Sequence, residues 1–384
     1  MSEAVAGESH GSRVSAPGRA RTQNLVPIGT KICVLAGRFA QRAATLRSHL
    51  GGMGLRYALL GVAVLASVAI SLRYGAHPLS WADLGQLCFD VDGATVGRAT
   101  VNALVYDIRL PRIVAALAIG AGLSVAGASY QGLFRNSLVS PDILGASSGA
   151  AFGAALGIML SWSVLGIQGL AFASGLSAVA LTYGLSRGVG GGTFTLKLVL
   201  TGMVVGSLGM AGVAVIKTLA DPYSKLPLIT YWLLGSLSSV TTPDVQLLLP
   251  PLALGVAVLL ALRWPLNVMA LGEDEARALG VPTGTVRVLT LLSATLVTAV
   301  AVAVAGVIGW VGLMVPHLVR FMIGPNHRDL LPASLLLGAL FLLWADNLAR
   351  WLFVVELPLG VVTCACGIPI FLVLLRRASR SWND

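Results

Sequence analysis

Long apolar runs dominate this sequence, and they constrain its fold more than any other feature. A helix needs about 20 mostly apolar residues to cross the hydrocarbon core of a bilayer. Only 11% of the residues are charged, whereas soluble domains carry roughly 25%. We therefore predict an all-α polytopic membrane protein with ten transmembrane helices, at 57–73, 109–133, 143–161, 164–186, 195–219, 245–263, 283–306, 308–323, 330–352 and 358–375.

One further apolar stretch, 226–238, is too short to cross a bilayer. It contains Tyr231 and Trp232, and both residue types favour the interface between membrane and water. We expect an interfacial or re-entrant helix there. Small residues also recur at a spacing of four, as in Gly149 and Gly153, which predicts close packing between helices.

The positive charge of the chain indicates its orientation. Residues 1–56 are basic and lack an apolar core of signal-peptide length. They predict a partly disordered cytoplasmic tail ahead of a membrane domain over 57–380, with both termini in the cytoplasm. Nucleic acid is an alternative partner for such a tail, but the positive-inside rule accounts for its charge without one. The lysines and arginines predicted outside are Arg73, Arg98, Arg109, Arg112, Lys217, Lys225 and Arg350.

A polar segment at 265–282, reading PLNVMALGEDEARALGVP, interrupts the apolar pattern on the predicted inner side. It predicts two short helices joined at Gly272, with an ion pair between Glu273 and Arg277 four residues apart. Gly280 is expected to end the second helix. An ordered loop with an acidic start and an apolar face indicates a surface held by another protein. The alternative is a capped interfacial loop with no partner.

Several kinds of chemistry lack their motifs in this sequence. There is no Gly-Lys dipeptide and hence no phosphate-binding P-loop. The five histidines form no HExxH pattern, and we find no clear carboxylate pair in the middle of a span. These observations count against an intramembrane enzyme and a stand-alone secondary transporter, although both stay as alternatives. If ATP drives this protein, another chain must bind it.

Three arginines are predicted at the outer rim. Arg109 and Arg112 begin the second span, and Arg350 lies at the same level on the ninth. Such side chains can reach lipid headgroups, or they can receive carboxylates from a partner because arginine forms bidentate pairs. The pattern alone leaves both interpretations open.

Six motifs, in this order along the chain, resemble the FecCD family, the permeases of type II ABC importers, which include the vitamin B12 importer permease. They are RLPR at 109–112, QGLFRNSLVSPDILGASSGAAFG at 131–153, ALGEDEARALG at 270–280, GWVGLMVPHLVRF at 309–321, HRDLLP at 327–332 and ELPLGVVTCACGIPIF at 356–371. The resemblance covers about 57–376. It does not account for residues 1–56.

The resemblance implies a homodimer in the bacterial inner membrane, with a central pathway between ten-span subunits and two cytoplasmic ABC ATPases beneath it. ATP and Mg would be bound by the ATPases, so this chain would hold no cofactor and no metal and would catalyse no reaction. The polar loop would supply coupling helices that fit the ATPase. The residues that match this role are Leu271, Gly272, Glu273, Ala276, Arg277, Leu279 and Gly280.

The resemblance also implies a periplasmic binding protein whose acidic residues dock on the permease, at positions that match Arg109, Arg112 and Arg350. The family's cytoplasmic gate is formed by the loop after the second span and the start of the fifth. The matching gate residues are Asn136, Leu138, Thr195 and Leu196. Ser137 departs from the family, which commonly has proline there.

The cargo implied by the resemblance is a metal chelate. The SPDILG motif is more similar to the ferric-siderophore members than to the vitamin B12 member. We therefore expect a ferric siderophore first, haem second and a corrinoid third.

Overall fold

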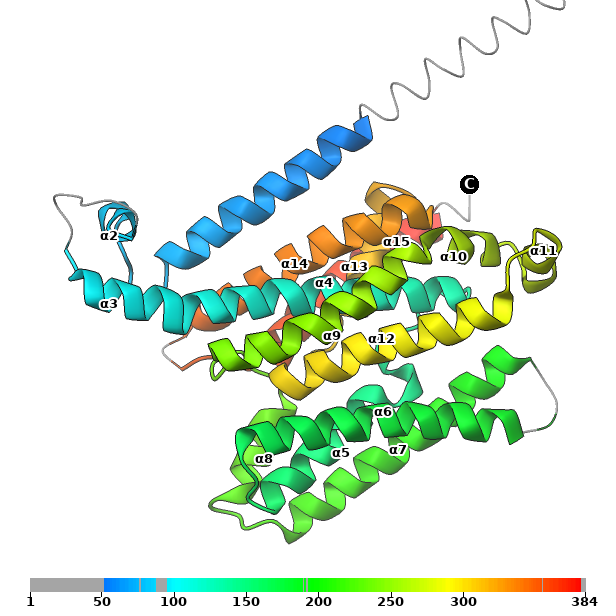
Figure 1. Ribbon diagram of the computed structural model, residues 1–384, viewed down its shortest axis with the longest axis horizontal. Coiled ribbons are helices and arrows are strands. Elements are labelled where there is room, and N and C mark those ends of the chain that lie inside the picture. The colour runs from blue at the N-terminus through cyan, green and yellow to red at the C-terminus, as the bar shows by residue number, and fades with distance from the viewer. Residues whose placement is uncertain are drawn as a thin grey trace, which may run out of the picture. The chain divides into compact units, whose positions relative to one another are not determined.

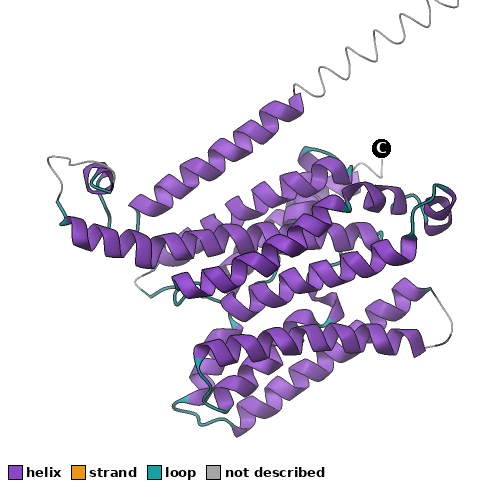
Figure 2. Ribbon diagram, in the orientation of Figure 1, coloured by secondary structure: helices purple, strands orange, loops and turns teal. Residues whose placement is uncertain are grey.

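The computed structural model describes residues 52–75, 77–87, 95–188, 190, 193–353 and 355–380, with side chains up to 373. Two units, Met1–Gly54 and Leu55–Asp384, divide the chain. Most of the predicted tail over 1–56 lies outside the described residues. Every regular element among the described residues is helical, as Figure 2 shows, so the all-α prediction is confirmed.

The long apolar helices coincide with the predicted spans. Within the described part of the chain, seven helices are long and apolar enough to cross a membrane. They are Gly52–Arg73, Arg98–Leu133, α6 (Val164–Gly188), α7 (Phe194–Leu219), α9 (Thr242–Ala261), α12 (Thr283–Ala305) and α14 (His327–Trp351). The second of these contains α3 (Arg98–Asn102), a π-helical segment η1 (Ala103–Arg109) and α4 (Leu110–Leu133).

Three shorter apolar helices match the remaining predicted spans: α5 (Ala146–Met159), α13 (Val311–Met322) and α15 (Leu359–Arg380). The other helices are α2 (Trp81–Gly85), a 3₁₀ turn η2 (Pro141–Leu144), α8 (Lys225–Leu233), α10 (Arg263–Met269) and α11 (Glu273–Ala278). The stretch predicted to be too short to cross thus forms α8, a helix of nine residues. The exact number of crossings stays a prediction.

Helix α4 forms the core of the bundle, and nearly all of its side chains are buried. Figure 1 shows it running between α14 and α9. Its glycines let neighbouring backbones touch: a Cβ on Gly127 would lie 1.8 Å from the Gly312 carbonyl oxygen, and one on Gly120 would lie 2.2 Å from that of Gly338. Close backbone approach of this kind is typical of helix packing in lipid.

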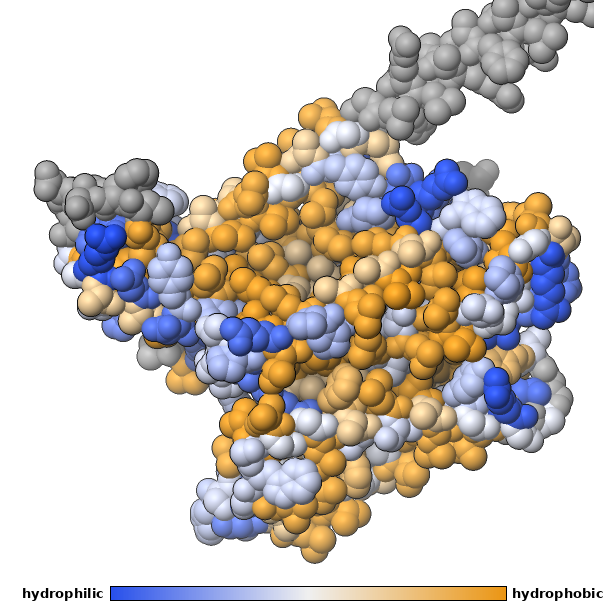
Figure 3. All heavy atoms as spheres, viewed as in Figure 1, coloured by the Kyte–Doolittle hydropathy of each residue, from blue (hydrophilic) through white to orange (hydrophobic). Residues whose placement is uncertain are grey.

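The predicted small-residue row on α5 packs against α6. A Cβ on Gly149 would lie 2.5 Å from the Ala178 Cβ, and one on Gly153 would lie 2.5 Å from the Leu170 carbonyl oxygen, which confirms the packing prediction. Figure 3 shows an apolar surface along the helices, with polar side chains gathered near the helix ends. This pattern is that of a multi-pass membrane protein.

The segment after the first helix, which the charges predict to lie on the outer side, is organised by Asp83. Its carboxylate accepts hydrogen bonds from the backbone N–H groups of Ser80, Thr95 and Val96, at 2.8, 2.7 and 3.0 Å. Hydrogen bonds from the Ser80 side chain and from these backbone groups lower the pKa of Asp83. The carboxylate therefore stays charged and fastens residues 95–96 to the start of α2.

Candidate functional site

The polar loop has the predicted form of two short helices, α10 and α11, joined at Gly272. Gly280 follows α11 with φ of +78°, a left-handed conformation that favours glycine. The backbone N–H of Gly280 donates to the Arg277 carbonyl oxygen at 2.9 Å, which closes the last turn of the loop. Local sequence therefore fixes the shape of this loop on both sides of α11.

Glu273 connects the loop to the rest of the bundle through two arginines. The predicted pair with Arg277 is present, with Arg277 Nη2 2.7 Å from Glu273 Oε1. Sequence reasoning missed the second pair, in which Arg287 Nη2 on α12 lies 2.7 Å from Glu273 Oε2. Thr283 Oγ1 lies 3.4 Å from Oε1. We call Glu273, Arg277 and Arg287 the Glu273 clamp, and it fastens α11 to α12.

The clamp also reaches the predicted gate. The Arg287 guanidinium lies 5.0 Å from the centre of the Phe194 ring, and Phe194 is the first residue of α7. A guanidinium over an aromatic face at this distance makes a cation–π contact. One side chain thus touches both the polar loop and the residue preceding Thr195 and Leu196.

The clamp is expected to be insensitive to pH between about pH 5 and pH 8. Burial raises the pKa of the Glu273 carboxyl, but Arg287 and Arg277 together outweigh it and hold the pKa below its usual 4.5. The stabilisation is therefore present above that usual value and is lost only as the pH falls through the lower, folded value. Binding of the ATPase measured across a pH series should change only in the acidic range, and Glu273→Gln should lack that acidic step.

Of the three apolar residues, other than glycine, that are predicted to meet the ATPase, two face outward and one does not. Leu271 is 68% exposed and Leu279 is 61% exposed, whereas Ala276 is fully buried. Exposed leucines beside an ordered polar loop fit a surface that another protein covers. Ala276 instead packs into the subunit's own core, so direct contact with a partner stays a prediction for the exposed residues of the loop.

The arginines predicted at the outer rim meet the buried carboxylate of Asp346. Arg112 Nη2 lies 2.9 Å from Asp346 Oδ1, and Arg350 Nε lies 3.3 Å from Asp346 Oδ2. Arg112 also pairs with Glu356 at 3.0 Å. The Asp346 side chain is fully buried, and those of Arg112 and Arg350 are each only 9% exposed. We call Arg112, Asp346, Arg350 and Glu356 the outer ion cluster, and it joins α4, α14 and the loop that precedes α15.

Arg109 is held separately, by backbone carbonyl groups. Its guanidinium donates to the carbonyl oxygens of Leu72, Arg73 and His77, the second at 3.1 Å. All three arginines therefore point into the subunit, which argues against anchoring to lipid headgroups. Docking of a binding protein on these arginines stays a prediction. Because the arginines are buried, a partner's carboxylate could bind them only alongside the carboxylates and carbonyl groups that they already contact.

The two predicted gate segments contact each other, but at residues further along the chain than those predicted. Asn136 Oδ1 accepts a hydrogen bond from the Leu138 backbone N–H at 2.9 Å, which shapes the loop after α4. Leu138 and Leu196 are more than half exposed. The loop reaches α7 further along, where a Cβ on Gly202 would lie 2.4 Å from the Ile143 carbonyl oxygen. The gate role of Asn136, Leu138, Thr195 and Leu196 stays a prediction.

Comparison with known proteins gives one consistent family. The FecCD transport family matches residues 63–377. The molybdate import system permease of Haemophilus influenzae is 37% identical over 321 residues, 84% of this chain and 95% of that protein. The cobalamin import system permease of Halobacterium salinarum is 43% identical over 278 residues, 72% of this chain and 74% of that protein.

An iron chelatin transport system permease of Helicobacter pylori is 36% identical over 321 residues, 83% of this chain and 97% of that protein. A solved ABC transporter of the metal-chelate type, in an inward-facing conformation, superposes with a TM-score of 0.77 at 35% identity. That match covers 84% of this chain and 99% of the other. Such systems imply an ABC ATPase and a binding protein as partners. The chain therefore belongs to the FecCD transport family and is a membrane permease of an ABC importer.

Proposed function

We propose that this permease imports a metal chelate across the bacterial inner membrane, as a homodimer with both termini in the cytoplasm and two ABC ATPases bound to its coupling loops. The single observation that supports the energy coupling is the Glu273 clamp. It ties an ordered, partly apolar loop to α12 and, through Arg287, to the start of α7. Two ATPases closing on nucleotide would move the two loops together.

The proposed movement follows from the contacts of the clamp. Glu273 on α11 pairs directly with Arg287 on α12 at 2.7 Å. A displacement of α11 is therefore transmitted to α12 through this ion pair. Arg287 in turn contacts Phe194, so the start of α7 moves with it. A rigid-body shift of packed helices of this kind opens and closes a pathway in known switching proteins.

If α7 lines the pathway of the proposed homodimer, its uncharged surface would suit a bulky cargo of shielded charge. Between Leu198 and Ile216 the helix carries no charged residue, and much of one face is exposed. The large exposed side chains on it are Leu200, Met203, Val204, Leu208, Met210 and Val215. A ferric chelate presents mostly its organic shell to such a surface, so we rank a ferric siderophore first, with haem and cobalamin after it. Molybdate is a second candidate because a molybdate permease matches over 95% of its length.

Reconstitution in proteoliposomes tests the proposal. The permease should be combined with its cognate ATPase and binding protein and offered ferric siderophores, haem, cobalamin and molybdate. We expect ATP-dependent uptake of an iron chelate. Uptake of the other cargoes should be lower by at least about tenfold. Uptake of molybdate alone would overturn the assignment of a chelate. Uphill transport without an ATPase would overturn the coupling mechanism and favour a secondary transporter.

A further inference from the structure

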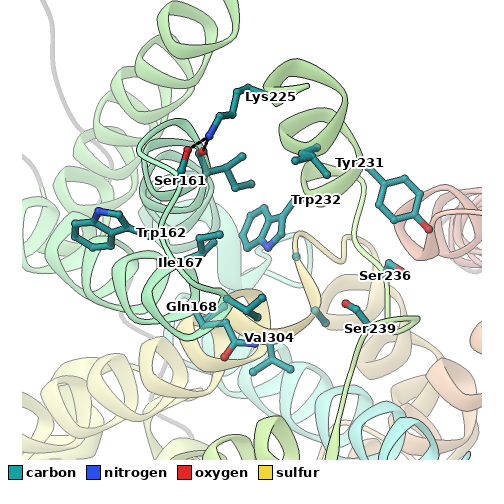
Figure 4. A pocket seen from close by; sticks show the side chains of 16 residues that line it. Ser161, Trp162, Ile167, Gln168, Lys225, Tyr231, Trp232, Ser236, Ser239 and Val304 are labelled. Carbon is teal, nitrogen blue, oxygen red and sulfur yellow. Dashed lines mark hydrogen bonds between the residues drawn. The ribbon is translucent and has the colours of Figure 1, made fainter. Parts of the chain in front are cut away.

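A cavity of about 500 Å³ lies among the ends of α5, α6, α8 and α12. The topology predicted from the charges places all of these ends on the outer side of the membrane, where cargo arrives. Figure 4 shows the cavity from close by, with lining side chains that come from separate helices. Its volume lies within the range of small-molecule sites, about 300–1,000 Å³. Neither the coupling loop nor the outer ion cluster contributes a lining residue.

One cation, Lys225, lines the cavity, and it forms no ion pair with the nearby Asp221, although the two charges interact electrostatically. Lys225 Nζ donates to the Ile158 carbonyl oxygen at 3.0 Å and to Ser161 Oγ, as the dashed lines in Figure 4 show. Asp221, which lies nearby in sequence, instead accepts hydrogen bonds from the Tyr223 N–H at 3.0 Å and the Ser224 hydroxyl at 2.6 Å. No ion pair of Lys225 is found among the described residues. An ammonium group has three donors, so one is left for a ligand.

The rest of the lining is largely aromatic and apolar. Trp162, Tyr231 and Trp232 are among the lining residues, and the first two are 50% and 43% exposed. Ser236 and Ser239 add hydroxyl groups on the opposite side from Lys225 in Figure 4. Rings of this kind hold flat apolar groups, and a few placed polar groups set their orientation.

We propose that this cavity is an outer subsite for a flat, partly apolar group that carries an anionic oxygen, such as the catecholate arm of a ferric chelate. The anionic oxygen lies against Lys225 and the ring stacks among Trp162, Tyr231 and Trp232. The inference rests on the proposed import of metal chelates and narrows the cargo to those with aromatic anionic arms. A lipid phosphate offers the same charge without the ring, so the test must separate the two sources.

Equilibrium binding to the permease–ATPase complex in nanodiscs tests the subsite directly. The probes are a ferric tris-catecholate and a ferric tris-hydroxamate, which is uncharged and lacks aromatic rings. Wild-type complex should bind the catecholate more tightly. Lys225→Gln should raise its Kd by about tenfold, the effect of losing one charge-assisted hydrogen bond, and should leave the hydroxamate unaffected. Lys217→Gln, which removes a cation near the outer end of α7 that does not line the cavity, should change neither Kd.

A second pair of variants addresses the volume of the cavity without touching Lys225. Ser239→Phe should fill it and weaken catecholate binding, whereas Ser239→Ala should not. Equal catecholate Kd values for wild type, Lys225→Gln and Ser239→Phe would overturn the subsite. Binding that disappears when anionic lipids are omitted from the nanodisc would assign the cavity to a headgroup and overturn the role in cargo binding. If wild-type proteoliposomes import no chelate, the proposed function itself is refuted. Uptake by the wild type is therefore measured before the binding variants are compared.

Discussion

Replacing Glu273 with arginine is expected to lower ATP-coupled uptake by at least about tenfold. The wild-type carboxylate pairs with Arg277 and Arg287, each at 2.7 Å. Arginine at position 273 would place three cations together, and like charges in contact cost several kcal/mol. The loop would then separate from α12, so ATPase movement would no longer reach α7. Uptake and ATP hydrolysis measured in the same proteoliposomes should show hydrolysis continuing without transport.

Two further variants make this result specific. Asp274 lies on the same helix, but its side chain is 95% exposed and lies 3.9 Å from Arg277, so Asp274→Arg should leave most uptake intact. The double variant Glu273→Arg/Arg287→Glu restores one contact between opposite charges and should recover part of the uptake. Full uptake in the single Glu273→Arg variant would show that the clamp does not transmit the movement.

Replacing Asp346 with leucine is expected to destabilise the permease by about 3–5 kcal/mol, the usual cost of removing one partner from a buried ion pair. Asp346 is fully buried between Arg112 and Arg350. Leucine at this position would remove the carboxylate that both buried arginines pair with. Arg112 would retain only Glu356, which lies 3.0 Å away. The measurement is the fraction of monodisperse protein after heating in detergent, which should fall sharply relative to wild type.

Glu356→Gln is the matched control, because it contacts the same arginine from a site where the side chain is 38% exposed. A partly exposed ion pair contributes less than a fully buried one, so thermal stability should fall much less than in Asp346→Leu. Equal losses in the two variants would contradict the assignment of Asp346 as the centre of the outer ion cluster. The pair of measurements therefore separates burial from charge.

Local sequence predicted the candidate site only where its parts are close along the chain. The pair of Glu273 and Arg277 was predictable because residues four apart on a helix face each other. Arg287 was not, since it meets Glu273 only after the chain turns at Gly280 into α12. The outer arginines were found as a group, but their burial against Asp346 could not be anticipated from a pattern that fits lipid headgroups equally well.

The sequence by itself determined that the chain is a bundle of apolar helices with an ordered polar loop, because helix length, apolar runs and glycine positions act within short windows. Only the tertiary structure decided which charges meet. Arg112 reaches Asp346 across 234 positions of sequence because α4 and α14 pack backbone to backbone at Gly120 and Gly338. Such a contact depends on the packing of whole helices, and in an apolar bundle many packings satisfy the same hydropathy pattern.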